Sequence, residues 1–152
     1  MKVIQLLSDR KQEILDEAAL ALLRARLTHY VADGQEVARE RLGVLLDLLL
    51  DCVSRSSLAP MTDYSRKVAE RRYEAGFGLH EVQTAFNVLE EIVWRRILDG
   101  MKPEEFGEAI GLVSTVLGAG KDTLARTYVT LATRHKAPSL DLRALFAGTT
   151  GP

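Results

Sequence analysis

The chain has 152 residues and a formal net charge of −1, so it lacks the basic excess that is typical of nucleic-acid-binding proteins. Hydrophobic residues make up 47% of it, which is enough for the core of one domain and too much for a disordered chain. A single cysteine excludes an internal disulfide, and no apolar run is long enough for a signal peptide or a membrane span. We therefore expect a cytoplasmic protein that binds neither membranes nor nucleic acid.

Helical periodicity begins near the N-terminus. The first predicted helix runs from residue 8 or 9 to residue 31, where apolar residues recur every three or four positions, and Asp33-Gly34 ends it. The second predicted helix covers residues 35–55 and is apolar round most of its circumference. This pattern is typical of a helix that is buried centrally or lies in a subunit interface. Cys52 lies in this helix, and its apolar neighbours predict a buried, unreactive thiol.

Three more helices are predicted in the second half of the chain. The third begins after Pro60, with Thr62 or Asp63 as its N-cap, and ends at Gly76. The fourth covers residues 79–100, and the fifth runs from residue 103 to about residue 134. No segment has the alternation of a strand. We predict an all-α bundle of about five main helices over residues 1–136, followed by a linker or tail over residues 137–152.

The stretch LGAGKDTLAR, residues 117–126, contains the Gly-Lys pair of a phosphate-binding loop. That motif also requires a glycine at position 115 and a hydroxyl after Lys121, but the chain has Thr115 and Asp122 there. The helical rhythm runs through the stretch, so we predict no nucleotide site. A different pattern predicts that another helix backbone packs closely against one face of this helix, because small residues recur there at Gly107, Gly111, Ser114 and Gly118.

No catalytic or metal site is predicted. The three histidines, His29, His80 and His135, lie on separate segments without metal-ligand spacing, and we interpret them as exposed or helix-terminal. No nucleophile, base and metal ligand converge, so we expect neither an enzyme nor a cofactor. An alternative is a globin-like arrangement in which His80 would be the proximal haem ligand, although the dipole at its helix start disfavours added positive charge.

The segment from Tyr64 to Trp94 contains a tyrosine, then A-x-x-R, then G-F-x-L-x-E-V and an amphipathic helix. Gly76 can end a helix in the left-handed conformation, Phe77 can pack across the corner, and Glu81 lies in the first turn of the next helix. This pattern resembles the N-terminal sensory domain of the RsbT co-antagonist family of bacterial stress regulators. The matched positions are Tyr64, Ala69, Arg72, Gly76, Phe77, Leu79, Glu81 and Val82.

The resemblance implies a non-catalytic helical domain that dimerises and relays a signal to an output domain or a protein partner. It places the contacts to the signal or partner at Tyr64, Arg72, Gly76, Phe77, Leu79 and Glu81. No output domain follows in this sequence, so we expect one in a longer chain or in a partner. The broad apolar stripes also favour a homodimer. The alternative function is a haem- or small-ligand-binding globin-like sensor.

Overall fold

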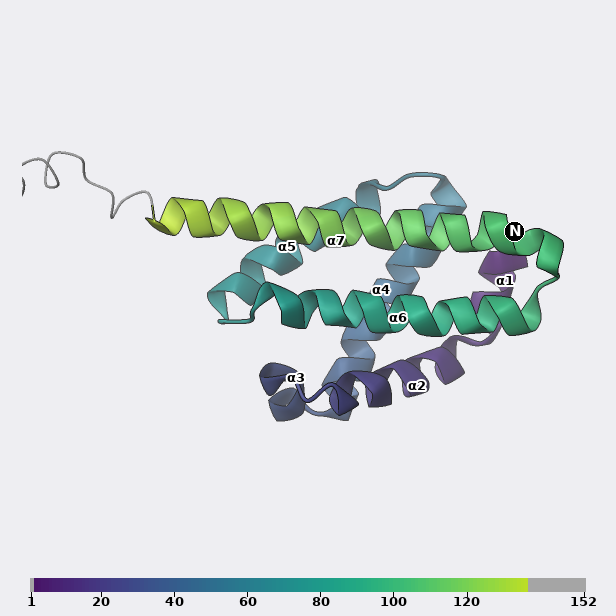
Figure 1. Cartoon of the computed structure of the whole chain (residues 1–152), viewed down its shortest axis with the longest axis horizontal. Coiled ribbons are helices and arrows are strands. Elements are labelled where there is room, and N and C mark those ends of the chain that lie inside the picture. Colours follow the sequence, from purple (N-terminus) through teal and green to yellow (C-terminus); the bar gives the residue numbers. More distant parts are fainter. Residues whose placement is uncertain (1, 137–152) are drawn as a thin grey trace, which may run out of the picture.

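The computed structural model describes residues 2–136, and within them the chain forms seven α-helices and one short 3-10 turn, without strands (Figure 1). The predicted all-α class is confirmed, while the globin-like arrangement stays a prediction. The predicted tail over residues 137–152 lies outside the described residues. The elements in chain order are α1 (Lys2–Asp9), α2 (Lys11–Arg24), α3 (Thr28–Asp33), α4 (Gln35–Arg55), α5 (Ala59–Glu74), α6 (Leu79–Gly100), η1 (Pro103–Glu105) and α7 (Phe106–Lys136).

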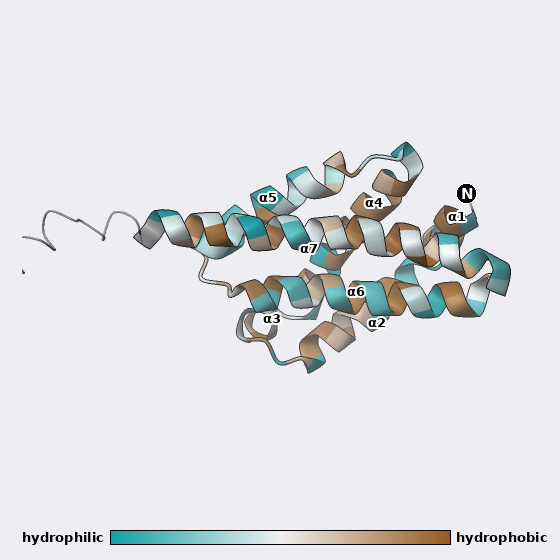
Figure 2. Ribbon diagram, turned by 45° about the horizontal axis from the view of Figure 1, so that its top comes forward, coloured by the Kyte–Doolittle hydropathy of each residue, from teal (hydrophilic) through white to brown (hydrophobic). Residues whose placement is uncertain are grey.

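The two longest helices, α6 and α7, run side by side in opposite directions along the length of the molecule (Figure 1). Hydrophobic and hydrophilic residues alternate along both ribbons, as expected for helices that bury one face (Figure 2). Helix α5 packs against α7, and α2 packs against α6 and α4. Helix α4 contacts all six of the other α-helices. Of the two alternatives predicted for residues 35–55, central burial is therefore the one that the structure supports, and Cys52 is buried as predicted.

The single helix predicted from residue 8 or 9 to residue 31 is wrong, because the structure has three helices there. Helix α1 starts earlier and buries Val3 and Leu7. Helix α2 ends before Arg26, which has a left-handed backbone with φ of 52°, and Leu27 is extended. The break changes the chain direction, so that α2 buries Leu22 and α3 buries Tyr30. The segment contains no glycine or proline that would signal this break, so its local helix propensity predicts a continuous helix. The burial of Leu22 and Tyr30 in the tertiary structure outweighs that propensity.

The third predicted helix has the right end but the wrong start. Helix α5 begins at Ala59, so Thr62 and Asp63 lie inside it instead of capping it. Pro60 occupies the first turn, where its missing N–H would have no partner in any case. The hydroxyl of Thr62 donates to the carbonyl of Ala59 at 3.2 Å. The proline was the better signal for this helix start.

The close packing predicted for the small-residue face of α7 is wrong within the chain. A Cβ added at Gly107, Gly111 or Gly118 would meet nothing within 4 Å. The close approach occurs at Gly120, where an added Cβ would lie 2.6 Å from the ring of Phe86. Gly120 meets the core and the other three glycines do not, because the buried face of α7 runs through Val113, Leu117, Gly120 and Leu124.

Lys121 lies inside the continuous helix α7, as the helical rhythm predicted. Its ammonium group donates to Asn87 Oδ1 at 3.0 Å and to Glu90 Oε1 at 3.2 Å. Lys121 therefore joins α7 to α6. Within α6, Glu91 and Arg95 form an ion pair one turn apart, with Arg95 Nη2 2.6 Å from Glu91 Oε1.

Candidate functional site

The turn between α5 and α6 has the geometry that its sequence predicts. Gly76 has a φ of 84°, which is the left-handed conformation that favours glycine at the end of a helix. The N–H of Phe77 donates to the carbonyl of Arg72 at 2.9 Å and so caps the last turn of α5. The chain reverses direction here, and the next residues enter α6.

Phe77 packs across this corner against α3. Its side chain is 7% exposed, and its ring stacks on the imidazole of His29 with the ring centres 4.0 Å apart. The ring of Tyr30 meets it edge-on at 6.0 Å. The guanidinium carbon of Arg72 lies 5.2 Å from the centre of the Phe77 ring, within the range of a cation–π contact. The predicted packing of Phe77 across the corner is confirmed.

Glu81 is the hydrogen-bond acceptor of this corner. Its Oε2 lies 2.9 Å from Nδ1 of His29 and accepts the backbone N–H of His29 at 3.3 Å, while its Oε1 accepts the N–H of Gly78 at 3.3 Å. Partial burial raises the pKa of Glu81, but the hydrogen bonds from His29 and Gly78 outweigh it and hold this pKa below its usual value. The carboxylate is ionised and only accepts, so Nδ1 of His29 carries the proton of their hydrogen bond.

Tyr128 connects the corner to α7. Its hydroxyl donates to the carbonyl of Phe77 at 2.9 Å, and this contact is buried. Its ring meets that of Tyr73 edge-on at 5.5 Å. Burial raises the pKa of Tyr128 to about 12, although the charge of Arg72 opposes this shift. The hydroxyl therefore stays a donor at neutral pH.

A small crevice of about 20 Å³ opens between α3, α4, α5 and α6. Its polar lining is Tyr30, Arg41, Tyr64 and Arg72, and the rest is apolar. Burial raises the pKa of Tyr30 and of Tyr64, while the nearby arginines oppose both shifts. Burial and the charge of Arg41 lower the pKa of Arg72. Arg41 Nη1 forms an ion pair with Asp33 at 2.8 Å.

The structure brings the six sequence-predicted site residues to the two sides of one corner. Tyr64 and Arg72 line the crevice, Gly76 makes the turn, Phe77 and Glu81 contact α3, and Leu79 is half-buried against the core. Their role in contacting a signal or partner stays a prediction. Sequence reasoning missed four partners on other elements: His29, Tyr30, Arg41 and Tyr128. No local pattern marks them, because they meet the motif only through the fold.

His80, on which the haem alternative rests, is exposed in the first turn of α6. His29 is helix-terminal, in the first turn of α3, as one of the two alternatives predicted, and it is partly buried and hydrogen-bonded to Glu81. Among residues 2–136, no group of three or more His, Cys, Asp or Glu side chains is placed to hold a metal ion.

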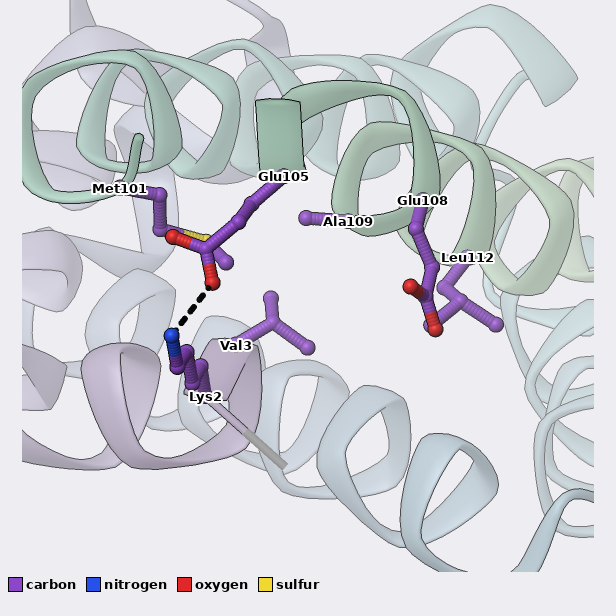
Figure 3. A pocket seen from close by; sticks show the side chains of 7 residues that line it. All are labelled: Lys2, Val3, Met101, Glu105, Glu108, Ala109 and Leu112. Atoms are coloured by element: carbon purple, nitrogen blue, oxygen red, sulfur yellow. Dashed lines mark ion pairs between the residues drawn. The ribbon is translucent and has the colours of Figure 1, made fainter. Parts of the chain in front are cut away.

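Two further hollows lie at the other end of α7. One, of about 200 Å³, lies between α1 and the start of α7, where Lys2 Nζ reaches Glu105 Oε2 at 3.0 Å beside Val3 and Ala109 (Figure 3). The other is a groove of about 620 Å³ between the end of α4, the start of α5 and the first turns of α7. Gly107 and Gly111, at which an added Cβ would meet nothing within 4 Å, line this groove. The small-residue face of α7 therefore borders the groove and does not contact another helix of the chain at these two positions.

Comparison with known proteins gives one match. The family model described as the RsbT co-antagonist protein rsbRD N-terminal domain matches residues 12–136. No curated protein and no solved structure matches the chain significantly. No helix in the part of the chain that the structure describes has the length and apolar character to span a membrane.

Proposed function

We propose that this chain, which belongs to the family of RsbT co-antagonist protein rsbRD N-terminal domains, is a dimeric relay module in a bacterial stress-signalling pathway. The family is one of regulatory domains, and we infer that the domain works by binding and conformational change instead of catalysis. Its output would be a protein partner or an attached output domain. The expected cytoplasmic location stays a prediction.

One observation carries the relay part of this proposal. The buried hydrogen bond from Tyr128 to the carbonyl of Phe77 links α7 to the motif corner. On the other side of that corner, Phe77 and Glu81 contact His29 of α3. A ligand or partner that displaces Phe77 would therefore change the environment of Tyr128. Helix α7 continues past Tyr128 to Lys136, and we propose that it transmits this change.

Exposed apolar side chains support the homodimer. Trp94 and Leu98 are 40% and 51% exposed, and their spacing of four places them on one face of α6. Leu20, on the neighbouring helix α2, is also exposed. A twofold interface that covers these side chains would remove apolar surface from water.

Light scattering at micromolar concentration tests the dimer. We expect about twice the 16.8 kDa chain mass, and we expect Leu98→Glu to give the mass of one chain while keeping its helical circular dichroism. Leu58→Glu is the matched control, because Leu58 is comparably exposed but lies at the start of α5. A monomeric wild-type chain would contradict the dimer, and dissociation by Leu58→Glu alone would contradict the proposed face.

A further inference from the structure

We propose that the crevice between Arg72, Arg41, Tyr30 and Tyr64 binds a carboxylate group. The crevice does not include Glu81 or Tyr128, but Arg72 and Tyr30 in its lining contact the ring of Phe77. Binding at this crevice does not depend on the proposed function, whereas a role of the carboxylate as the regulatory signal does.

Arg72 is a cation without an ion-pair partner in the described part of the chain, which is the first observation that supports carboxylate binding. Its side chain is half-buried, and its guanidinium forms no ion pair or hydrogen bond with any of the described residues. The guanidinium carbon lies 5.2 Å from the centre of the Phe77 ring, and a cation–π contact of this kind does not use the N–H donors of the group. Arg41, which also lines the crevice, is already paired with Asp33. The lining therefore carries one positive charge in excess, which one carboxylate would neutralise.

The hydroxyls of Tyr30 and Tyr64 are available donors, which is the second observation that supports carboxylate binding. Tyr30 lines the crevice and is only 2% exposed as a residue. Among the described residues Ser65 Oγ is the one fully buried side-chain polar atom without a partner, so the Tyr30 hydroxyl is not fully enclosed, and it has no hydrogen-bond partner among these residues. The hydroxyl of Tyr64 is likewise without one in the described part of the chain. Because burial keeps both phenols protonated, each can donate to an anion.

The size of the crevice selects the kind of anion. Its volume of about 20 Å³ is close to the space that one buried water occupies. A carboxylate oxygen fits that space and meets the fork of Arg72 in the planar geometry that guanidinium groups favour. A tetrahedral phosphate is bulkier and would stay at the mouth. The carboxylate can belong to a free carboxylic acid or to a Glu or Asp side chain of a protein partner.

The test is a titration of the ¹⁵N-labelled chain at constant ionic strength. Sodium acetate represents a free small carboxylate, and a capped Gly-Glu-Gly peptide represents the Glu side chain of a protein partner. We expect saturable shifts of the Arg72 and Arg41 Nε–H signals and of the backbone amide of Tyr64. Sodium chloride and sodium phosphate should not give saturable shifts. The tighter of the two probes identifies the source. Shifts that never saturate with either probe, or equal shifts with phosphate, would overturn the proposal.

Matched variants locate the site. Arg72→Gln should weaken binding about tenfold or more, as expected for lost charge-assisted hydrogen bonds. Arg71→Gln should leave the affinity within about twofold, because Arg71 is exposed on the same helix and does not line the crevice. If Arg72→Gln does not fold, Tyr64→Phe removes one donor at nearly constant shape and should still weaken binding. Unchanged affinity in the folded variants would overturn the site. The titration reads binding to the domain alone, so its result does not depend on the dimer or the relay.

Discussion

The carboxylate of Glu81 joins α6 to α3 through His29, whose Nδ1 lies 2.9 Å from Oε2 although the residues are 52 positions apart. The backbone N–H groups of His29 and Gly78 complete the set of donors to this carboxylate. The negative charge lies in the first turn of α6, where the helix dipole favours it. One side chain therefore begins a helix, closes the α5–α6 corner and holds α3 against it.

Glu81→Gln should destabilise the domain in a pH-dependent way. The folded-state pKa of Glu81 is lowered, so its contribution is present above the unfolded value of about 4.3 and is lost as the pH falls through the folded value. We expect the variant to lose about 1–2 kcal/mol of unfolding free energy at pH 7, and we expect this difference to narrow below about pH 4.

Urea denaturation from pH 3 to pH 7 measures this difference. Glu36→Gln is the control, because Glu36 is also in the first turn of a helix but is exposed. Its effect should stay within about 0.5 kcal/mol. A constant difference between Glu81→Gln and the wild type over the whole range would contradict the role of the Glu81 charge.

Tyr128→Phe should weaken the connection between α7 and the corner. The substitution removes the hydroxyl that donates to the carbonyl of Phe77 and leaves that buried acceptor without its partner. We expect a loss of about 1–2 kcal/mol in chemical denaturation. Tyr64→Phe is the matched control, because the Tyr64 hydroxyl has no protein partner in the described residues, and it should cost less than about 0.5 kcal/mol. Equal effects of the two substitutions would count against the bond.

Two alanine substitutions in α7, Gly120→Ala and Gly118→Ala, should change the free energy of unfolding in opposite directions. At Gly120 the new Cβ would lie 2.6 Å from the Phe86 ring and 3.1 Å from Met61, both buried, so we expect overpacking to cost about 1–3 kcal/mol. At Gly118 the Cβ meets nothing within 4 Å, so the gain in helix propensity should stabilise the chain by up to about 1 kcal/mol. Thermal melts of the two variants measure both effects. A stabilising Gly120→Ala would show that the core at this point is looser than the structure indicates.

Local signals predicted much of the fold. The helix predicted over residues 35–55 coincides with α4, because Asp33-Gly34 marks its start, and the helix over residues 79–100 coincides with α6. The break near Arg26 was missed, since it is set by the burial of Leu22 and Tyr30 on differently directed helices. A small-residue pattern predicted the wrong close contact, because it does not show which face of α7 meets the core.

The motif was readable from sequence in its turn geometry but not in its partners. Gly76 and Phe77 behave as their residue types suggest, because the requirement for positive φ and the capping pattern are local. His29 and Tyr128 reach the motif from α3 and α7 and leave no trace in the spacing of residues 64–94. The sequence alone therefore predicts the turn between α5 and α6 but does not predict its contacts with His29 and Tyr128.

Hydrogen exchange in the Glu81→Gln variant measures whether the α5–α6 corner is coupled to α7. The substitution is made on α6, where it loosens contacts to α3. We expect faster exchange of the α7 amides around Tyr128, with exchange in the first turns of α7 unchanged. Tyr64→Phe, which breaks no hydrogen bond to the described protein residues, should leave α7 exchange at the wild-type rate. Faster exchange confined to α3 and the start of α6, with α7 fully protected, would contradict this coupling.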